Sequence, residues 1–377
     1  MHVDMDDGAD LPYWLTLRRA GLGTTNFALL LRHFPSMDEA WHAPAGELAQ
    51  SGIDGQYVRA IEAGRIKFDP DAELALLERE GARALTWLSD GYPEVLREIT
   101  QSPPVIFVRG IQGPEFEQAV AVVGTRHVTP YGRQACEHFC ETLADAGVAI
   151  ISGLARGVDA IAHRVAIERG ATTVAVVAGG IDKIYPRENA GLAERIAAQG
   201  CIVSEYPVGI PARRDYFPRR NRILAGLAKA TLVVEAGEGS GALHTANWAF
   251  EQQRDVFAIP GSVFSRQSWG TNQLIREHTA KLVATPNQLL EELNLVSAGA
   301  QPQLMPVAAP IVSEARKTLV VGDDEEPLLR LLGEAPVHID ELARASGLPI
   351  AEVSSTLQIM ELTGAVRQHG PMMYSRA

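Results

Sequence analysis

The stretch Ala119–Gly132, AVAVVGTRHVTPYG, carries the pattern on which the predicted fold depends. It begins with five apolar residues, which is typical of a short strand buried on both faces of a parallel sheet. A turn follows at Gly124, and Thr129 and Pro130 then suit the N-cap and the first position of a helix. This combination favours an anion site that includes the guanidinium of Arg126, although an ordinary strand-to-helix connection has the same pattern.

The alternation of strand and helix continues along the chain. Short valine-rich runs predict strands at residues 120–123, 148–152, 173–178, 201–204, 231–235 and 256–259. Helical spacing of apolar residues predicts helices at residues 131–146, 159–169, 189–198 and 242–253. Strands and helices that alternate in this way predict an α/β domain with a doubly wound parallel sheet.

Smaller segments flank this domain. Residues 1–68 predict a helical module similar to SAM or helix-hairpin-helix domains, with a glycine hairpin at residues 21–23. No lysine follows that hairpin, so packing is favoured over DNA contact as its role. The α/β domain spans residues 69–295, a linker spans 296–322, and residues 323–377 predict a winged helix. The second helix of that unit carries Glu352 and Glu361 but no Lys or Arg, which argues against groove reading.

Composition limits the classes of function. The 377 residues include three cysteines, Cys136, Cys140 and Cys201, which argues for a cytoplasmic protein without disulfides, metal or cofactor. No apolar run suits a membrane span, so no membrane partner is expected. The net charge of −12 counts against nucleic-acid binding by the whole surface. A local basic cleft can still attract a polyanion.

Candidate binding residues follow the predicted strands, where ligands bind in doubly wound sheets. The densest signal is residues 213–222, in which five arginines are interleaved with Tyr216 and Phe217. Guanidiniums that follow a backbone and aromatic rings that stack on bases are typical of single-stranded DNA binding, although a solvated arginine surface bridged to acids has the same composition. The candidates are Gly124, Thr125, Arg126, Ser152, Gly153, Arg156, Gly179, Lys183, Arg187, Phe217, Arg219, Arg220, Asn221, Arg222, Ser240 and Gly241.

Enzymatic function is the alternative hypothesis. Asp159, His163 and His244 could do acid–base work, but His163 lies in an apolar helical pattern that indicates a structural role. The chain contains no G-x-S-x-G, Walker, H-E-x-x-H or G-x-G-x-x-G motif at the required place. The sequence therefore predicts a protein that is not an enzyme. A Rossmann-like hydrolase or transferase acting on a nucleotide is the alternative.

The motifs together resemble the DNA-processing protein A family (DprA, also called Smf). The resemblance covers residues 92–290 and includes VVGTRHVTPYG, SGLARGVDAIAH, GGIDKIYPREN, FPRRNRILAGLA and VVEAGEGSGALHTA. It implies an extended Rossmann-like fold and a non-catalytic cytoplasmic protein. Such a protein would bind and protect incoming single-stranded DNA during natural transformation and load the RecA recombinase.

The resemblance also assigns residues. It implies phosphate contacts by Arg126, Arg187, Arg220 and Arg222, which match arginines or basic positions of the family motifs. It implies a homodimer formed through residues 262–278, with Leu274 and Ile275 as apolar contacts. His278 stands where the family usually has glycine, so this chain departs from the family pattern within that segment.

Overall fold

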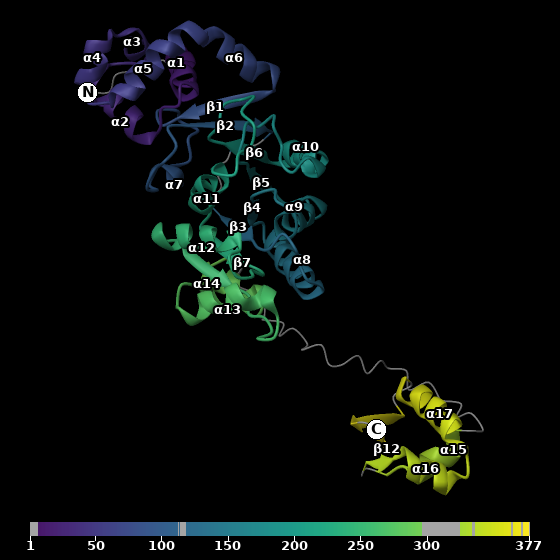
Figure 1. Ribbon diagram of the computed structural model, residues 1–377. Coiled ribbons are helices and arrows are strands. Elements are labelled where there is room, and N and C mark those ends of the chain that lie inside the picture. The colour runs from purple at the N-terminus through teal and green to yellow at the C-terminus, as the bar shows by residue number, and fades with distance from the viewer. Residues whose placement is uncertain are drawn as a thin grey trace. The chain divides into compact units, whose positions relative to one another are not determined.

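The computed structural model describes residues 7–111, 113, 118–295, 325–333, 336–362, 365–370 and 372–376 (Figure 1). The chain divides into two compact units, Met1–Gln303 and Leu304–Ala377. The predicted linker, residues 296–322, lies outside the described residues. No helix among the described residues has the length and apolar character needed to cross a membrane.

The first unit is built on a nine-stranded sheet with the order β1-β2-β6-β5-β4-β3-β7-β8-β9. The strands from β6 to β9 in this order are parallel, which confirms the doubly wound core. The edge formed by β1 and β2 is antiparallel, so the sheet is mixed and not purely parallel. The strands are β1 (Ala82–Thr86), β2 (Val105–Gly110), β3 (Ala119–Val123), β4 (Ala149–Ser152), β5 (Thr173–Val176), β6 (Cys201–Ser204), β7 (Ala230–Val233), β8 (Asp255–Ala258) and β9 (Lys281–Leu282).

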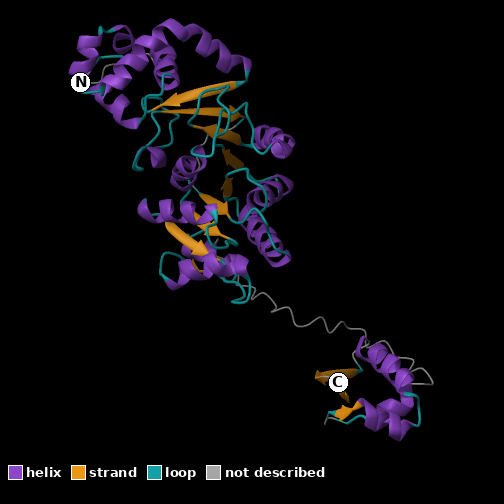
Figure 2. Cartoon of the chain, viewed as in Figure 1, coloured by secondary structure: helices purple, strands orange, loops and turns teal. Residues whose placement is uncertain are grey.

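Helices cover both faces of this sheet (Figures 1 and 2). Alternate side chains of β3 point into different clusters: Val120 and Val122 pack with α8 and α9, and Val123 packs with α11 and α12. Cys136 and Cys140 are fully buried in the α8 side of the core. The helices are α8 (Pro130–Asp145), α9 (Val158–Glu168), α10 (Ala190–Gln199), α11 (Tyr216–Gly226), α12 (Gly241–Glu251), α13 (Trp269–Arg276) and α14 (Pro286–Glu292), with 3₁₀ turns η1 (Arg187–Asn189) and η2 (Arg266–Ser268).

The N-terminal helices are continuous with the α/β core. A single apolar cluster joins side chains such as Leu17 and Phe27 with Val105 and Phe107 of β2 and Ile196 of α10. These helices therefore belong to the same compact unit as the sheet. They are α1 (Asp7–Arg19), α2 (Thr24–His33), α3 (Met37–His42), α4 (Ala45–Gln50), α5 (Gly55–Lys67) and α6 (Pro70–Arg79), and the short α7 (Glu94–Arg97) follows β1.

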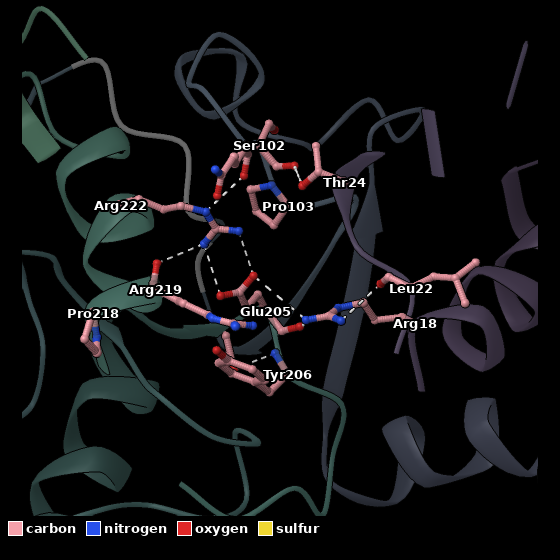
Figure 3. A network of polar contacts seen from close by, with 12 residues as sticks. Arg18, Leu22, Thr24, Ser102, Pro103, Glu205, Tyr206, Pro218, Arg219 and Arg222 are labelled. Atoms are coloured by element: carbon pink, nitrogen blue, oxygen red, sulfur yellow. Dashed lines mark hydrogen bonds and ion pairs between the residues drawn. The ribbon is translucent and has the colours of Figure 1, made fainter. Parts of the chain in front are cut away.

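A buried ion-pair network adds a polar connection between α1 and α11 (Figure 3). Arg222 of α11 donates to both carboxylate oxygens of Glu205, at 3.1 Å to Oε1 and 2.7 Å to Oε2. Arg18 of α1 donates to the Glu205 backbone carbonyl at 3.0 Å, and its guanidinium lies 3.9 Å from Glu205 Oε2. Both Glu205 and Arg222 are less than one-tenth exposed, so this carboxylate holds two elements together.

The second unit contains the predicted helices and wing. Helices α15 (Glu325–Leu331), α16 (Ile339–Ser346) and α17 (Ile350–Leu362) pack around a small apolar core. Strands β11 (Val366–Gly370) and β12 (Met373–Arg376) form the wing, and the short β10 (Val337–His338), which the sequence analysis missed, adds a third strand. Gly347 adopts φ +70° at the end of α16, a left-handed conformation that ends the helix.

His163 occupies the structural position that its apolar surroundings predicted. Its side chain is fully buried on α9, and its Nδ1 lies 2.7 Å from the hydroxyl of Thr173. That hydroxyl donates to the Ile150 carbonyl at 2.8 Å, so Nδ1–H is the donor in the contact with the histidine. Burial lowers the pKa of His163 to about 3.

We expect this burial to make stability depend on pH. The unfolded chain takes up a proton on His163 below about pH 6.5, whereas the folded chain does not until about pH 3. The free energy of unfolding should therefore fall as the pH drops through this window, by up to about 1.4 kcal/mol per pH unit from this group. Urea unfolding of the wild type and of His163→Leu at several pH values measures the difference. Identical pH dependence in the two proteins would contradict it.

Loss of the Glu205 carboxylate should destabilise the first unit. Glu205→Gln leaves two buried guanidiniums without their counter-charge, which costs about 3–5 kcal/mol in the free energy of unfolding. The matched control is Glu194→Gln, since Glu194 is 69% exposed and pairs with Arg109 at 2.6 Å. That exposed pair contributes about 0–1 kcal/mol. Urea unfolding distinguishes the two, and equal small losses would argue against the role given to Glu205.

Candidate nucleic-acid interface

The carboxyl ends of the parallel strands surround a cleft of about 420 Å³. Its walls are the β3–α8 turn with Arg126, the first turns of α11 with Phe217 and Asn221, and the glycine turn before α12 with Ser240 and Gly241. Gly124, Thr125, Arg220 and His244 also line it. The cleft thus brings together predicted residues from three separate segments of the chain.

An arginine and two aromatic rings stand at one side of the cleft. The exposed Arg126 places its guanidinium carbon 5.7 Å from the centroid of the Phe217 ring. The Tyr185 ring lies 5.8 Å from Phe217 in an edge-to-face arrangement, and Tyr185 is 56% exposed. A hollow of about 50 Å³ between Tyr185 and Arg156 shares Arg126 and Phe217 with the cleft, so the two adjoin.

Tyr185 was missed as a candidate, although the sequence contained a signal for it. It follows the glycine turn after β5, at the carboxyl edge of the sheet where the other candidates were sought. A large aromatic residue in an exposed turn has no core to fill, which marks it as a surface for a flat ligand.

The remaining cations of this edge differ in how far they are neutralised. Arg156 pairs with Glu188 at 2.6 Å, and Lys183 pairs with Asp182 at 2.9 Å. Arg187 is exposed and follows Pro186, which lines the smaller hollow. Within the described part of the chain, neither Arg126 nor Arg187 forms an ion pair.

Most of the arginine-rich segment 213–222 belongs to a helix, so its side chains point in several directions. Residues Tyr216–Gly226 form α11, and Pro218 is tolerated there because it lies in the first turn. Successive residues of a helix are rotated by about 100° around its axis, so neighbouring arginines face different surroundings. Arg219 is exposed and does not line the cleft, whereas Arg220 and Arg222 are buried.

Arg222 does not fit the expected phosphate contact. Its guanidinium is bonded to Glu205, to the Gln101 carbonyl at 3.0 Å and to the Arg219 carbonyl at 3.0 Å (Figure 3). Its donors are therefore committed to holding α11 against β6 and the loop before β2. The expectation for this residue is corrected to a structural role.

Arg220 forms part of the cleft floor. It donates to the carbonyls of Gly153, at 2.8 Å, and Val176, which fixes the turn after β4 beside the end of β5. Burial lowers the pKa of Arg220 to about 10, so the group stays charged near neutral pH. A Cβ on Gly153 would overlap this guanidinium, so a glycine at this position leaves the space that Arg220 occupies.

Other predicted residues are buried beside the turns and do not line the cleft. Ser152 is fully buried and donates to the Val122 carbonyl at 2.6 Å. Gly179 is buried, and a Cβ there would meet the backbone of Ala212. The expectation that Ser152 and Gly179 contact a ligand directly is therefore corrected to a structural role.

The predicted anion site at the N-terminus of α8 is filled by the protein itself. Thr129 caps α8 as expected, by accepting from the Gly132 N–H at 3.0 Å. The buried Glu235 carboxylate then accepts from the Thr129 N–H at 2.9 Å and from its hydroxyl at 2.7 Å. A carboxylate already stabilises this helix end, so the ligand space lies on the Arg126 side of the turn.

Asp159, a candidate for acid–base work under the enzyme hypothesis, lies within the first turn of α9, whose N-cap is Gly157. Its carboxylate accepts from the N–H groups of Gly153, at 3.1 Å, and Ala155, at 3.3 Å. Burial raises the pKa of Asp159, against the opposing effect of Arg220. Asp159 therefore braces the turn that ends at α9.

The predicted subunit contact is corrected as well. Leu274 is buried on α13 and packs in the core that faces α11 and α12, with Ile275 partly buried against the same core. The exposed apolar residues of that segment are Val263, Phe264 and Trp269. No group of three or more His, Cys, Asp or Glu side chains among the described residues is placed to hold a metal ion.

Comparison with known proteins adds the family relationship. The family model for DNA recombination-mediator protein A matches residues 83–294, and the model for the DprA winged helix domain matches residues 312–370. Protein Smf of Synechocystis sp. is 34% identical over 97% of this chain and 98% of its own length. DNA processing protein DprA of Streptococcus pneumoniae is 36% identical over 73% of this chain and 95% of its own.

Solved structures agree with these relatives. The X-ray structure of DprA from Streptococcus pneumoniae has a TM-score of 0.65 at 34% identity, and covers 74% of this chain and 97% of that one. A structure of DNA processing protein A from Helicobacter pylori, which describes its single-stranded DNA binding mode, has a TM-score of 0.52 at 28% identity. It covers 56% of this chain and 95% of that chain. The extent of the family match and the identity along nearly the whole chain show that this protein belongs to the DNA recombination-mediator protein A (DprA/Smf) family.

Proposed function

We propose that the cleft and the smaller hollow beside it bind single-stranded DNA. The observation that carries this proposal is the row formed by Arg126, Phe217 and Tyr185. In this row, a guanidinium that forms no ion pair with any described residue lies against an accessible aromatic pair. Stacked bases contribute about 1–3 kcal/mol each in such sites, and guanidiniums contact the phosphates between them. The single-stranded DNA binding of the relative from Helicobacter pylori supports the same substrate class.

The geometry favours a strand over a single nucleotide. The cleft and the smaller hollow share a wall at Arg126 and Phe217, which gives successive nucleotides adjoining places. An exposed aromatic face requires an unstacked base, which a single strand presents and a duplex does not. Sequence tolerance follows, because every base has a face that can stack.

The alternative of nucleotide hydrolysis or transfer has less support from the site. The two oxygens of Glu235 accept bonds from Thr129, and Asp159 accepts bonds from two backbone N–H groups. Both carboxylates are therefore engaged by donors of the protein itself. We therefore propose a non-catalytic protein that protects incoming strands in the cytoplasm and loads RecA during natural transformation, as its family membership implies.

Removal of the Arg126 side chain should weaken DNA binding. A hydrogen bond to a charged group contributes about 1.5–3 kcal/mol, so Arg126→Ala should lower the affinity for oligo-dT about tenfold or more. The slope of log affinity against log salt should fall by about 0.7, since one phosphate contact is lost. Fluorescence anisotropy with labelled oligo-dT in a salt series measures both quantities.

The matched control is Arg164→Ala, which removes an exposed arginine from α9 that does not line the cleft. It should leave the affinity and the salt slope unchanged. Equal affinity of Arg126→Ala and the wild type would remove Arg126 from the site. Thermal stabilisation by a nucleoside monophosphate without any oligonucleotide binding would favour the enzyme hypothesis instead.

Self-association through residues 262–278 is a separate part of the proposal. Phe264 is 96% exposed and Val263 lies beside it, so these side chains suit a subunit contact better than the buried Leu274. Phe264→Asp should shift a dimer to the monomer in sedimentation velocity while the melting temperature stays unchanged. Phe250→Asp, at an exposed phenylalanine of α12, is the control and should remain dimeric. A wild type that is monomeric at all concentrations would overturn this part.

A further inference from the structure

A second hollow, of about 690 Å³, lies on the other side of α11, which we call the module hollow. The N-terminal helices contribute its first wall, with Gly23, Thr25, Gly52 and Tyr57. The opposite wall includes Gln101 and Arg219. Both walls belong to the same compact unit, so the module hollow lies within the first unit.

Helix α11 is the shared wall of the cleft and the module hollow. Phe217, Pro218 and Asn221 line the cleft, whereas Arg219 and Arg222 line the module hollow. The first turn of α11 is held in place, because the Pro218 carbonyl accepts from Trp248 at 3.2 Å and the Arg219 carbonyl accepts from Arg222 (Figure 3). The exposed Arg219 side chain therefore projects from a fixed helical turn between the cleft and the module hollow.

The charges of the module hollow suit a polyanion despite the acidic chain. The carboxylate of Glu205 is bonded to Arg222 and lies near Arg18, so it is compensated (Figure 3). Asp54 is the other carboxylate in the lining, and it caps α5 by accepting from the Gln56 N–H at 2.8 Å. Arg219 forms no ion pair with any described residue. Three arginines face two carboxylates, a local excess of one positive charge.

We propose that a single strand longer than the cleft crosses α11 at Arg219 and continues into the module hollow. Arg219 would contact the phosphate at the crossing, and the partly exposed Tyr57 would stack on a base beyond it. The N-terminal helices thereby become the second half of the DNA path. This inference rests on the proposed function of the cleft and extends it to a second binding segment.

The test compares strands of two lengths on the full chain. Tyr57→Ala removes the stacking face, and Thr25→Glu places a negative charge at an exposed position of the same wall. Each should lower the affinity for oligo-dT of about 20 nucleotides about fivefold or more, and leave that for about 6 nucleotides unchanged. Gln118→Glu, at the amino end of β3, adds the same charge away from both hollows and is the control.

The outcomes separate this inference from the proposed function. Loss of affinity for the long strand alone, with the melting temperatures and the Gln118→Glu control at wild-type values, supports the inference. Wild-type affinity of both variants for both strands overturns it, as does an equal loss for the two lengths. A wild type that binds neither strand overturns the proposed function itself, and the inference with it.

Discussion

The ion pair between Glu205 and Arg222 determines which surfaces α11 offers to a ligand. Arg222 donates to both oxygens of this buried carboxylate, and Arg18 reaches the same residue from α1. Once α11 is held in this orientation, Phe217 must face the cleft and Arg219 must face outward, because the helix fixes the angle between them. One buried contact thus connects the N-terminal helices, the sheet and both hollows.

The parallel core was predictable because its signals are local. The apolar run of β3, the glycine turn after it and the Thr129 cap are all contained within the stretch 119–132, and each has the predicted role. The antiparallel edge was less accessible, because no local pattern in the sequence indicates that β2 runs opposite to β6. The placement of the N-terminal helices on the sheet likewise depends on an apolar cluster that no single segment reveals.

The arrangement of the candidate site was predictable only in part. The motifs placed the candidates at the carboxyl edge of the sheet, and Arg126, Phe217, Asn221, Ser240 and Gly241 line one cleft there. The five arginines of residues 213–222 suggested more cations free to bind a ligand than the structure offers. The number of arginines does not reveal which of them are buried within a helix. A count by helical position would have separated Arg220, which faces the cleft, from Arg219 and Arg222, which line the module hollow, if Tyr216–Gly226 had been recognised as a helix.

Glu235 explains how an acidic protein can keep a cleft available to a polyanion. Its carboxylate stabilises the N-terminus of α8 from inside the protein, and the turn before that helix is left free to present Arg126 on its outer side. Glu205 is compensated by arginines in the same way beside the module hollow. At both places a buried carboxylate satisfies protein donors and exposes little negative charge to a ligand. The net charge of −12 describes the chain as a whole, whereas the cleft lining balances Arg126 and Arg220 against Asp159 and Glu238, and the lining of the module hollow holds one more arginine than carboxylate.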